Sequence, residues 1–332
     1  MKRFILRRLL LLIPTLLAII FIVFFVTSLT PGSPGRIILG ANAKQIEVDA
    51  INHELGFDKP FYARYADYVI NVFQGDLGTT YFTKKPVISE ILSRFPATLN
   101  LAFFSLIFSC IIGIPLGVFS AVKQYSVIDY LGTSLAILLA VIPTFWFALV
   151  LILFFSLELK ILPSSGTSTP LHYVMPVIVT SLPAIASILR MTRTTMLETI
   201  RTDYVRTARA KGLSEKKVIW YHAFKNALLP VVTIIGMSFG MTIGGTVITE
   251  SIFSIPGLGL LTINSIRNKD IPQVMGIVLF FSFLFLIIML LIDVFYAYLD
   301  PRIKATYDAK EETALRKGTF FKRTIRRVKR LV

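Results

Sequence analysis

Few side chains in this sequence could carry catalysis or bind a metal ion. The histidines His53, His172 and His222 lie far apart along the chain, and neither an H-E-x-x-H nor a G-x-S-x-G pattern occurs. Cys110 is the single cysteine, so it has no second thiol with which to form a disulfide or share a zinc ion. No G-x-x-x-x-G-K-[ST] phosphate loop occurs. We therefore expect no catalytic residue, no metal site and no cofactor bound by this chain.

The composition is that of a polytopic membrane protein. Of 332 residues, 55% are hydrophobic and 16% are charged, whereas about a quarter of the residues in a soluble domain are charged. The net charge of +16, from 35 Lys and Arg against 19 Asp and Glu, could suggest a nucleic-acid partner. The basic residues lie between apolar runs, however, and not on one soluble face. The expected partner of this surface is membrane lipid and not nucleic acid.

Six apolar runs reach the roughly 20 residues that a membrane-spanning helix needs. They cover residues 9–29, 95–122, 130–157, 172–189, 226–249 and 271–299. The fourth run is the shortest and contains Pro176 and Pro183, which membrane helices accept where neighbours satisfy the freed carbonyls. No A-x-A type cleavage site follows the first run, which favours an uncleaved span over a signal peptide. The expected fold class is all-α with about six transmembrane helices.

Lys and Arg collect near residues 1–10, 190–225 and 300–332, which fall on one side of a six-span topology. By the positive-inside rule this side is cytoplasmic, so both termini are expected inside. The expected organisation is a cytoplasmic N-terminus and first span (1–29), an extracytoplasmic insert (30–94), a membrane core (95–302) and a basic cytoplasmic tail (303–332). The many apolar and aromatic residues of the insert predict short amphipathic helices. The tail is typical of an interfacial helix attracted to anionic lipid.

Two carboxylates lie near the ends of apolar runs, where a charge is costly and therefore often functional. Glu250 follows the fifth run, and Asp293 lies near the end of the sixth. Both could instead reach water at the membrane interface. No series of Asp, Glu and His crosses the runs, which argues against a proton-coupled secondary transporter. The histidines fall on both sides of the predicted topology, which argues against a membrane-embedded transferase.

Residues 204–230, YVRTARAKGLSEKKVIWYHAFKNALLP, form a basic segment between two apolar runs. Ile200, Tyr204 and Ala208 recur at four-residue spacing, which predicts one face of a short helix. Gly212 fits the C-terminal cap of this helix, where a left-handed backbone is least costly without a Cβ atom. The segment therefore predicts a helix, a tight turn and a second helix at the cytoplasmic surface. A solvated connector is the alternative.

The same segment resembles the cytoplasmic loop of binding-protein-dependent ABC importer permeases, which carries Glu-Ala-Ala, a glycine and a closing Leu-Pro. Residues 206–208 take the first three positions, Gly212 is the glycine, and Leu229 and Pro230 close the pattern. Here the glutamate is missing, and Leu229 comes later than in most such loops. In both departures the segment resembles the loop of the dipeptide, oligopeptide and nickel permease branch of this family.

Three further segments resemble that branch, and the likeness covers residues 1–302. They are LGFDKPFYARYADYVINVFQGDLGTTYFTKKPVISEILSRFPATLNLA, IPTFWFAL and ESIFSIPGLGLLTINSIRNKDIPQVMG. The resemblance implies a type I ABC importer permease in the cytoplasmic membrane of a bacterium or archaeon. It also implies two cytoplasmic ATPases that bind ATP and Mg, a second homologous permease subunit in a heterodimer, and an extracytoplasmic substrate-binding protein. This chain would then have no ATPase site of its own.

The resemblance assigns ATPase coupling to the loop at about residues 198–225. Its expected contact residues are Tyr204, Arg206, Ala208, Arg209, Ala210, Gly212 and Leu213. Candidate residues of the translocation pathway are Phe145, Trp146, Gly240, Gly244 and Glu250. The two glycines could instead serve only close helix packing.

The branch allows peptide or nickel cargo. A metal pathway would be expected to offer thiol, thioether or imidazole ligands along its length, and the apolar runs hold one cysteine and scattered methionines. The runs do offer hydroxyls, aromatic rings and glycines. This lining suits peptides, whose main chain is constant and whose side chains vary. We predict import of di- or oligopeptides, with nickel or a metal chelate as the alternative cargo.

Overall fold

The computed structural model describes residues 2–29 and 32–299, which form helices and no strand. Thr79 and Pro86 form an isolated antiparallel bridge. The predicted basic tail, residues 303–332, lies outside the described residues.

The N-terminal part of the chain contains one long helix and three short ones. They are α1 (Lys2–Ser28), α2 (Pro34–Leu39), α3 (Gln45–Glu54) and α4 (Phe61–Phe73). The next part holds two long helices and a bent pair that ends in a π-helix: α5 (Val87–Val122), α6 (Val127–Val141), α7 (Thr144–Leu151), η1 (Ile152–Glu158) and α8 (Leu171–Ile200). The last part is α9 (Asp203–Ala210), α10 (Glu215–Lys217), the π-helix η2 (Val218–Ala223), α11 (Phe224–Gly245), α12 (Val247–Ile252), α13 (Leu258–Arg267) and α14 (Ile271–Leu299).

Five helices of the described residues are long and apolar enough to cross a membrane. They are Leu9–Ser28, Val87–Val122, Leu171–Ile200, Glu215–Ile252 and Ile271–Ile292. A sixth candidate is the bent pair formed by Val127–Val141 and Thr144–Glu158. These helices confirm the predicted all-α class with about six transmembrane segments.

The third predicted span differs from the structure, because residues 130–157 do not form one straight helix. The chain bends by 98° between α6 and α7. Pro143 has no N–H to donate to the helix and disfavours helical geometry at the residue before it. Ile142 accordingly has φ −60° and ψ 122°, an extended conformation. The proline therefore splits this apolar run into two helices.

The fourth span is also longer than predicted. The apolar run suggested residues 172–189 as the shortest span, whereas α8 continues for 30 residues to Ile200. Its extension carries Arg190 and Arg193. Pro176 and Pro183 both lie inside the helix without ending it.

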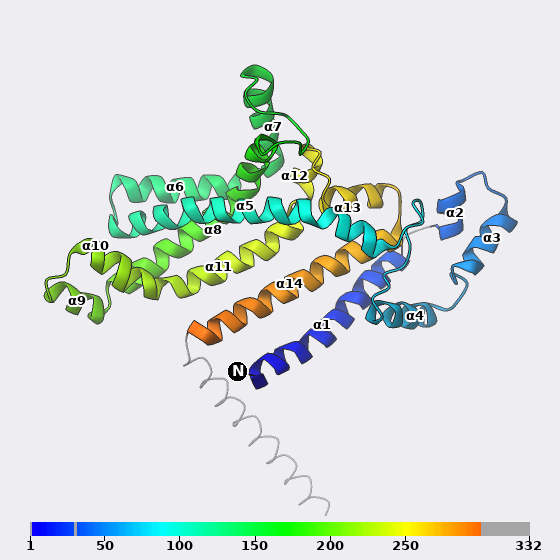
Figure 1. Cartoon of the computed structure of the whole chain (residues 1–332), viewed down its shortest axis with the longest axis horizontal. Helices are drawn as coiled ribbons and strands as arrows, with labels where there is room; N and C mark the ends of the chain where they lie inside the picture. The colour runs from blue at the N-terminus through cyan, green and yellow to red at the C-terminus, as the bar shows by residue number, and fades with distance from the viewer. Residues whose placement is uncertain (1, 30–31, 300–332) are drawn as a thin grey trace, which may run out of the picture.

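The long helices pack in a regular order (Figure 1). α5 and α8 lie side by side, and α6 packs against both. On the other side α11 packs against α8, α14 against α11, and α1 against α14. Gly117 brings α5 close to α8, because an added Cβ atom would lie 2.6 Å from Cβ of Thr192 and 2.8 Å from the carbonyl oxygen of Leu189. Small residues allow this kind of close approach between membrane helices.

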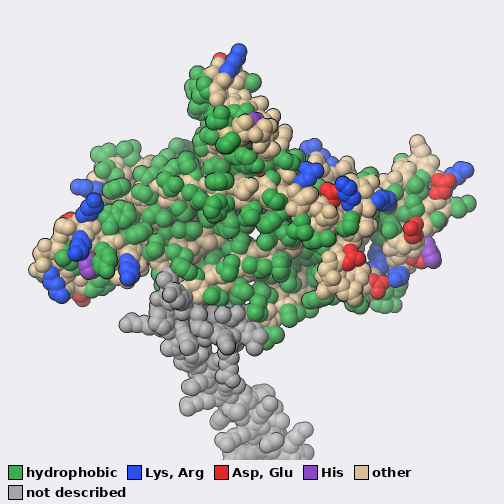
Figure 2. Space-filling model, viewed as in Figure 1, with side chains coloured by type: hydrophobic (Ala, Val, Ile, Leu, Met, Phe, Trp, Pro, Cys, Tyr) green, Lys and Arg blue, Asp and Glu red, His purple; other side chains and the backbone are tan. Residues whose placement is uncertain are grey.

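The predicted short helices of the insert are confirmed as α2, α3 and α4. Aromatic rings of α4 join it to the end of α1: the Phe24 ring centroid lies 5.3 Å from that of Phe61 and 5.7 Å from that of Tyr68. Figure 2 shows apolar side chains over the middle of the molecule and most of the charged side chains at its two ends, with a few more at the tip of the protrusion that contains α7. The end at α9 and α10 carries mostly Lys and Arg, and the end at α2 to α4 carries both signs.

Candidate functional site

The basic segment folds as the sequence predicts, into a short helix, a tight turn and a second helical stretch. α9 ends at Ala210, and Gly212 follows with φ +75°. The N–H of Gly212 donates to the carbonyl oxygen of Arg209 at 2.9 Å, and that of Lys211 donates to Thr207 at 3.0 Å. A Cβ atom on Gly212 would meet no atom within 4 Å. The left-handed backbone, and not a lack of space, is therefore what requires glycine here.

The buried face of α9 differs from the predicted one. The helix begins anew at Asp203 after a break, so its inward residues are Val205 (0% exposed) and Ala208 (5% exposed). They join an apolar cluster built from α5, α8, α9, η2 and α11. Its buried members are Val118, Ala121, Met196, Val205, Ala208, Val218, Ile219, Ala223 and Ala227. The loop is thus anchored in the protein's own core, and Ala208 is part of that anchor.

The other predicted contact residues lie on the outer side of the loop. Those exposed to solvent are Tyr204, Arg206, Arg209, Ala210 and Gly212, while Leu213 is half-buried against the apolar cluster. This outer face combines two guanidinium groups with an aromatic ring and a patch of exposed backbone at the turn. Such a face can pair with acidic and apolar groups of another protein.

Two side-chain interactions fix the loop in place. Arg209 Nε donates to Glu215 Oε1 at 2.7 Å across the Gly212 turn. Asn226 Nδ2 donates to the Tyr204 hydroxyl at 3.0 Å, which ties α9 to the start of α11. The Arg209 pair is exposed to solvent, so its contribution to stability is small. Its main effect is on the orientation of the guanidinium group.

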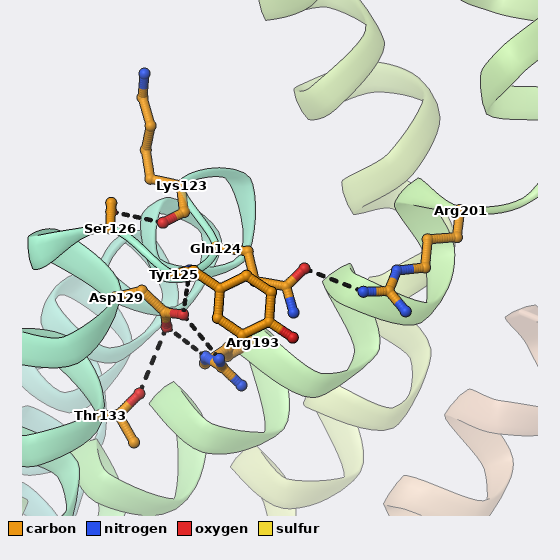
Figure 3. A network of polar contacts seen from close by, with 8 residues as sticks. All are labelled: Lys123, Gln124, Tyr125, Ser126, Asp129, Thr133, Arg193 and Arg201. Carbon is orange, nitrogen blue, oxygen red and sulfur yellow. Dashed lines mark hydrogen bonds and ion pairs between the residues drawn. The ribbon is translucent and has the colours of Figure 1, made fainter.

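An ion pair between buried Asp129 and half-buried Arg193 joins α6 to α8 near the start of the loop (Figure 3). Arg193 Nε donates to Asp129 Oδ1 at 2.6 Å, and Nη2 donates to Oδ2 at 2.9 Å. The N–H of Tyr125 also donates to Asp129, at 3.0 Å. Nearby, Arg201 donates to the side-chain oxygen of Gln124 at 3.0 Å. Sequence reasoning missed this network, although an arginine within a long apolar helix is a signal that a partner is near.

Glu250 lies at the opposite end of the core and is wholly buried at 0% exposed, so it does not reach an interface. Its Oε1 accepts hydrogen bonds from the hydroxyls of Thr98 at 2.7 Å and Thr246 at 2.8 Å. Its Oε2 accepts the N–H of Leu260 at 3.0 Å. An added Cβ atom on Gly257 would lie 2.4 Å from this carboxylate. Glu250 thereby holds α12, α13 and α5 together.

The remaining pathway candidates are not gathered at one place in the fold. Phe145 and Trp146 begin α7 just after the bend and are 52% and 51% exposed. Gly240 packs against α14, since an added Cβ atom would lie 2.8 Å from Cδ2 of Phe285. Gly244 is exposed, and a Cβ atom there would meet nothing within 4 Å. Their role in a pathway stays a prediction.

Two protein-family models match the chain. Residues 113–305 match the binding-protein-dependent transport system inner membrane component, and residues 1–102 match the N-terminal region of such a membrane component. The chain belongs to this family. The matched ranges of this transport component include the insert, the Gly212 loop and the Glu250 site, which confirms the resemblance seen in the sequence.

Curated relatives resemble this transport component over almost their whole length. The glutathione transport system permease protein GsiC of Pectobacterium atrosepticum is 38% identical over 304 residues, which span 92% of this chain and 99% of the relative. The same protein of Salmonella typhimurium is 39% identical over 305 residues, with the same coverage. The dipeptide transport system permease protein DppB of Alkalihalophilus pseudofirmus is 37% identical over 332 residues, which span 92% of this chain and 100% of the relative.

Solved structures share the fold of the transport component. An inward-facing structure of the MetNI methionine ABC transporter aligns with a TM-score of 0.55 at 18% identity, over 64% of this chain and 97% of that one. A second crystal form aligns with a TM-score of 0.53 over 65% of this chain and 99% of that one. This likeness confirms the type I ABC importer permease fold.

Proposed function

We propose that this chain is the permease subunit of an ATP-driven importer of di- or oligopeptides. The observation that carries the proposal is its similarity of 37–38% identity to permeases named for glutathione and for dipeptide transport, over 92% of the chain. Glutathione, like a dipeptide, is a short peptide. The chain would form half of a translocation pathway together with a second homologous permease subunit, as a heterodimer.

The loop around α9 is proposed to couple this chain to ATP hydrolysis. Arg206, Arg209, Ala210 and Gly212 are exposed on its outer face, while Val205 anchors its inner face. Two cytoplasmic ATPase subunits would bind ATP and Mg, and one of them would receive this outer face. The chain itself would contribute no catalytic residue.

The proposed orientation follows from the charges at the two ends of the molecule. The end at α9 and α10 carries mostly Lys and Arg, which the positive-inside rule assigns to the cytoplasm. Both termini would then be cytoplasmic, and the insert of residues 30–94 would face an extracytoplasmic substrate-binding protein. A cysteine placed at Asn71 in a Cys110→Ser background tests this. A reaction with a membrane-impermeant thiol reagent in intact cells supports the orientation, and reaction only after lysis overturns it.

The pathway candidates divide into two groups under this proposal. Phe145, Trp146 and Gly244 are exposed and therefore open to contact with the second permease subunit or with cargo. Gly240 and Glu250 are buried within this chain, so their proposed role is to position the helices that line the pathway.

Uptake of labelled peptides tests the cargo. Cells with the gene should accumulate labelled di- or tripeptides in an ATP-dependent manner, and cells without it should lose that uptake. Nickel accumulation measured in the same two strains should not change. Unchanged peptide uptake together with lost nickel accumulation would refute the peptide assignment and favour a metal-chelate importer.

A further inference from the structure

A cavity of about 260 Å³ lies where the insert meets the ends of two spanning helices. One side is formed by the last turn of α1, including Phe24, and by the first turns of α14, including Met275. The other side is formed by α4 and by the loop that follows it, including Arg64, Tyr68 and Tyr81. The cavity thus has a mainly apolar wall from the spans, while the insert supplies its charged side chains and its tyrosines together with some apolar ones.

The insert's side of the cavity holds donors without acceptors. Arg64 Nε and the hydroxyl of Tyr68 are buried and have no hydrogen-bond partner among the described residues. The Arg64 guanidinium carbon lies 4.3 Å from the centre of the Phe57 ring, a stacked position that leaves its edge free for hydrogen bonds. Burial raises the pKa of Tyr81 to about 12, so its phenol also stays protonated and able to donate.

The charge balance of the lining is positive. Lys59 Nζ lies 2.7 Å from Asp67 Oδ2, so these two lining charges compensate each other. Arg64 has no ion pair among residues 2–29 and 32–299. Asp270 accepts the N–H of Tyr81 and does not line the cavity. A half-buried cation with a free N–H is unfavourable unless an anion compensates it.

The position of the cavity points to the source of that anion. Its apolar wall consists of the terminal turns of two helices that can cross a membrane, so the cavity lies at the depth of lipid headgroups. α1 exposes large apolar side chains in the same turns, with Phe25 at 45% and Val26 at 58% exposed. A lipid could therefore place its acyl chains along α1 while its headgroup enters the cavity.

We propose that this cavity binds the phosphate group of a membrane lipid. Arg64, Tyr68 and Tyr81 donate hydrogen bonds to the phosphate oxygens, and the guanidinium group neutralises the phosphate charge. The bound lipid links the insert to α1 and α14. This inference does not depend on the cargo. If the insert faces outward, as proposed above, the bound lipid belongs to the outer leaflet, and this assignment is the one part that rests on the proposed orientation.

Native mass spectrometry of the full transporter, released from nanodiscs, tests the proposal. In nanodiscs of phosphatidylglycerol the wild type should retain one more lipid than the Arg64→Gln variant. Arg64→Lys, which keeps the charge and loses the planar fork, should retain it at reduced occupancy. Lys44→Gln is the matched control, because Lys44 is an exposed cation of the same insert that does not line the cavity. This control should retain as much lipid as the wild type.

Two compounds, added separately to the same complexes, distinguish a lipid phosphate from other ligands. Diacylglycerol, which lacks the phosphate, should not be retained at this site. Glycerol 3-phosphate at the same concentration should not displace phosphatidylglycerol, because it lacks the acyl chains that contact α1. Equal lipid retention by the wild type and by Arg64→Gln would overturn the site. Displacement by glycerol 3-phosphate would overturn the lipid as its source and assign the cavity to a soluble phosphate ester. Normal size-exclusion profiles of the variants show that they remain folded.

Discussion

Replacing Gly212 with valine is the sharpest perturbation of the proposed coupling loop. The residue has φ +75°, and a Cβ atom there would meet no atom within 4 Å. Steric overlap with neighbouring side chains therefore adds nothing to the free-energy cost of the substitution, and the whole cost comes from the backbone conformation. For L-residues the left-handed conformation costs roughly 1–2 kcal/mol, and a β-branched side chain lies at the upper end of that range.

This cost can be converted into an expected change in assembly. A loss of 1–2 kcal/mol corresponds to roughly 5- to 30-fold in an equilibrium constant. Because Val205 and Ala208 keep α9 anchored in the core, the strain is expected to displace the outer face of the loop without unfolding the spans. The affinity of the ATPase subunits should therefore fall by about one order of magnitude, and import should fall with it.

The assay measures ATPase copurification and labelled-peptide import in proteoliposomes for three variants. Gly212→Ala should have a smaller effect than Gly212→Val. Gly75→Val is the matched control, because Gly75 directly follows the C-cap of α4 with φ +85° and open space around its Cβ position, at the other end of the molecule. It should bind the ATPases like the wild type. Normal assembly and import by Gly212→Val would refute the coupling role of this turn, and an equal loss of ATPase binding in Gly75→Val would show a general effect of strain.

Three further predictions concern the packing of the spans. Glu250→Ala leaves three buried donors, Thr98, Thr246 and the N–H of Leu260, without their acceptor. At about 1–3 kcal/mol for each unsatisfied donor, it should lower the free energy of unfolding by at least about 3 kcal/mol, measured in detergent, whereas Glu250→Gln keeps the shape and should cost about 1–3 kcal/mol. Asp129→Ala and Arg193→Ala should show a coupling energy of about 1–3 kcal/mol in a double-mutant cycle, and simple additivity would show that the ion pair does not join α6 to α8. Gly240→Ala should cost about 1–3 kcal/mol through contact with α14, whereas a helical glycine with open space, such as Gly244, should tolerate alanine with no loss.

The sequence was sufficient to predict the class of fold and the Gly212 turn, because both depend on local properties. Apolar runs of membrane length identify spans from composition alone. A glycine between two helical patterns identifies a left-handed cap, since few other residues adopt that backbone conformation. The same reasoning predicted helices in the insert from its aromatic content.

The errors arose where distant residues decide the structure. The end of the fourth span was set at Leu189 because charges follow it, but Arg193 can continue the helix since Asp129, 64 positions earlier, compensates its charge. For Glu250 the sequence leaves a position at the membrane interface open, and this alternative is wrong, because its partner Thr98 comes from α5, 152 positions away in the sequence. The bend at Pro143 had a local signal, but hydropathy measures how apolar a segment is and carries no information about its direction.

The anchoring of α9 also limits how a partner could act on the spans. Val205 and Ala208 pack in one cluster with Val118 of α5, Met196 of α8 and Ala227 of α11. Close-packed cores resist small continuous deformation, so a force on the outer face of α9 would move the ends of these three helices together. The Asp129–Arg193 pair extends the same unit to α6. If the proposed coupling is correct, closure of the ATPases therefore rotates α5, α6, α8 and α11 as one body, and α14 and α1, which this cluster does not include, are where relative motion within the chain should begin.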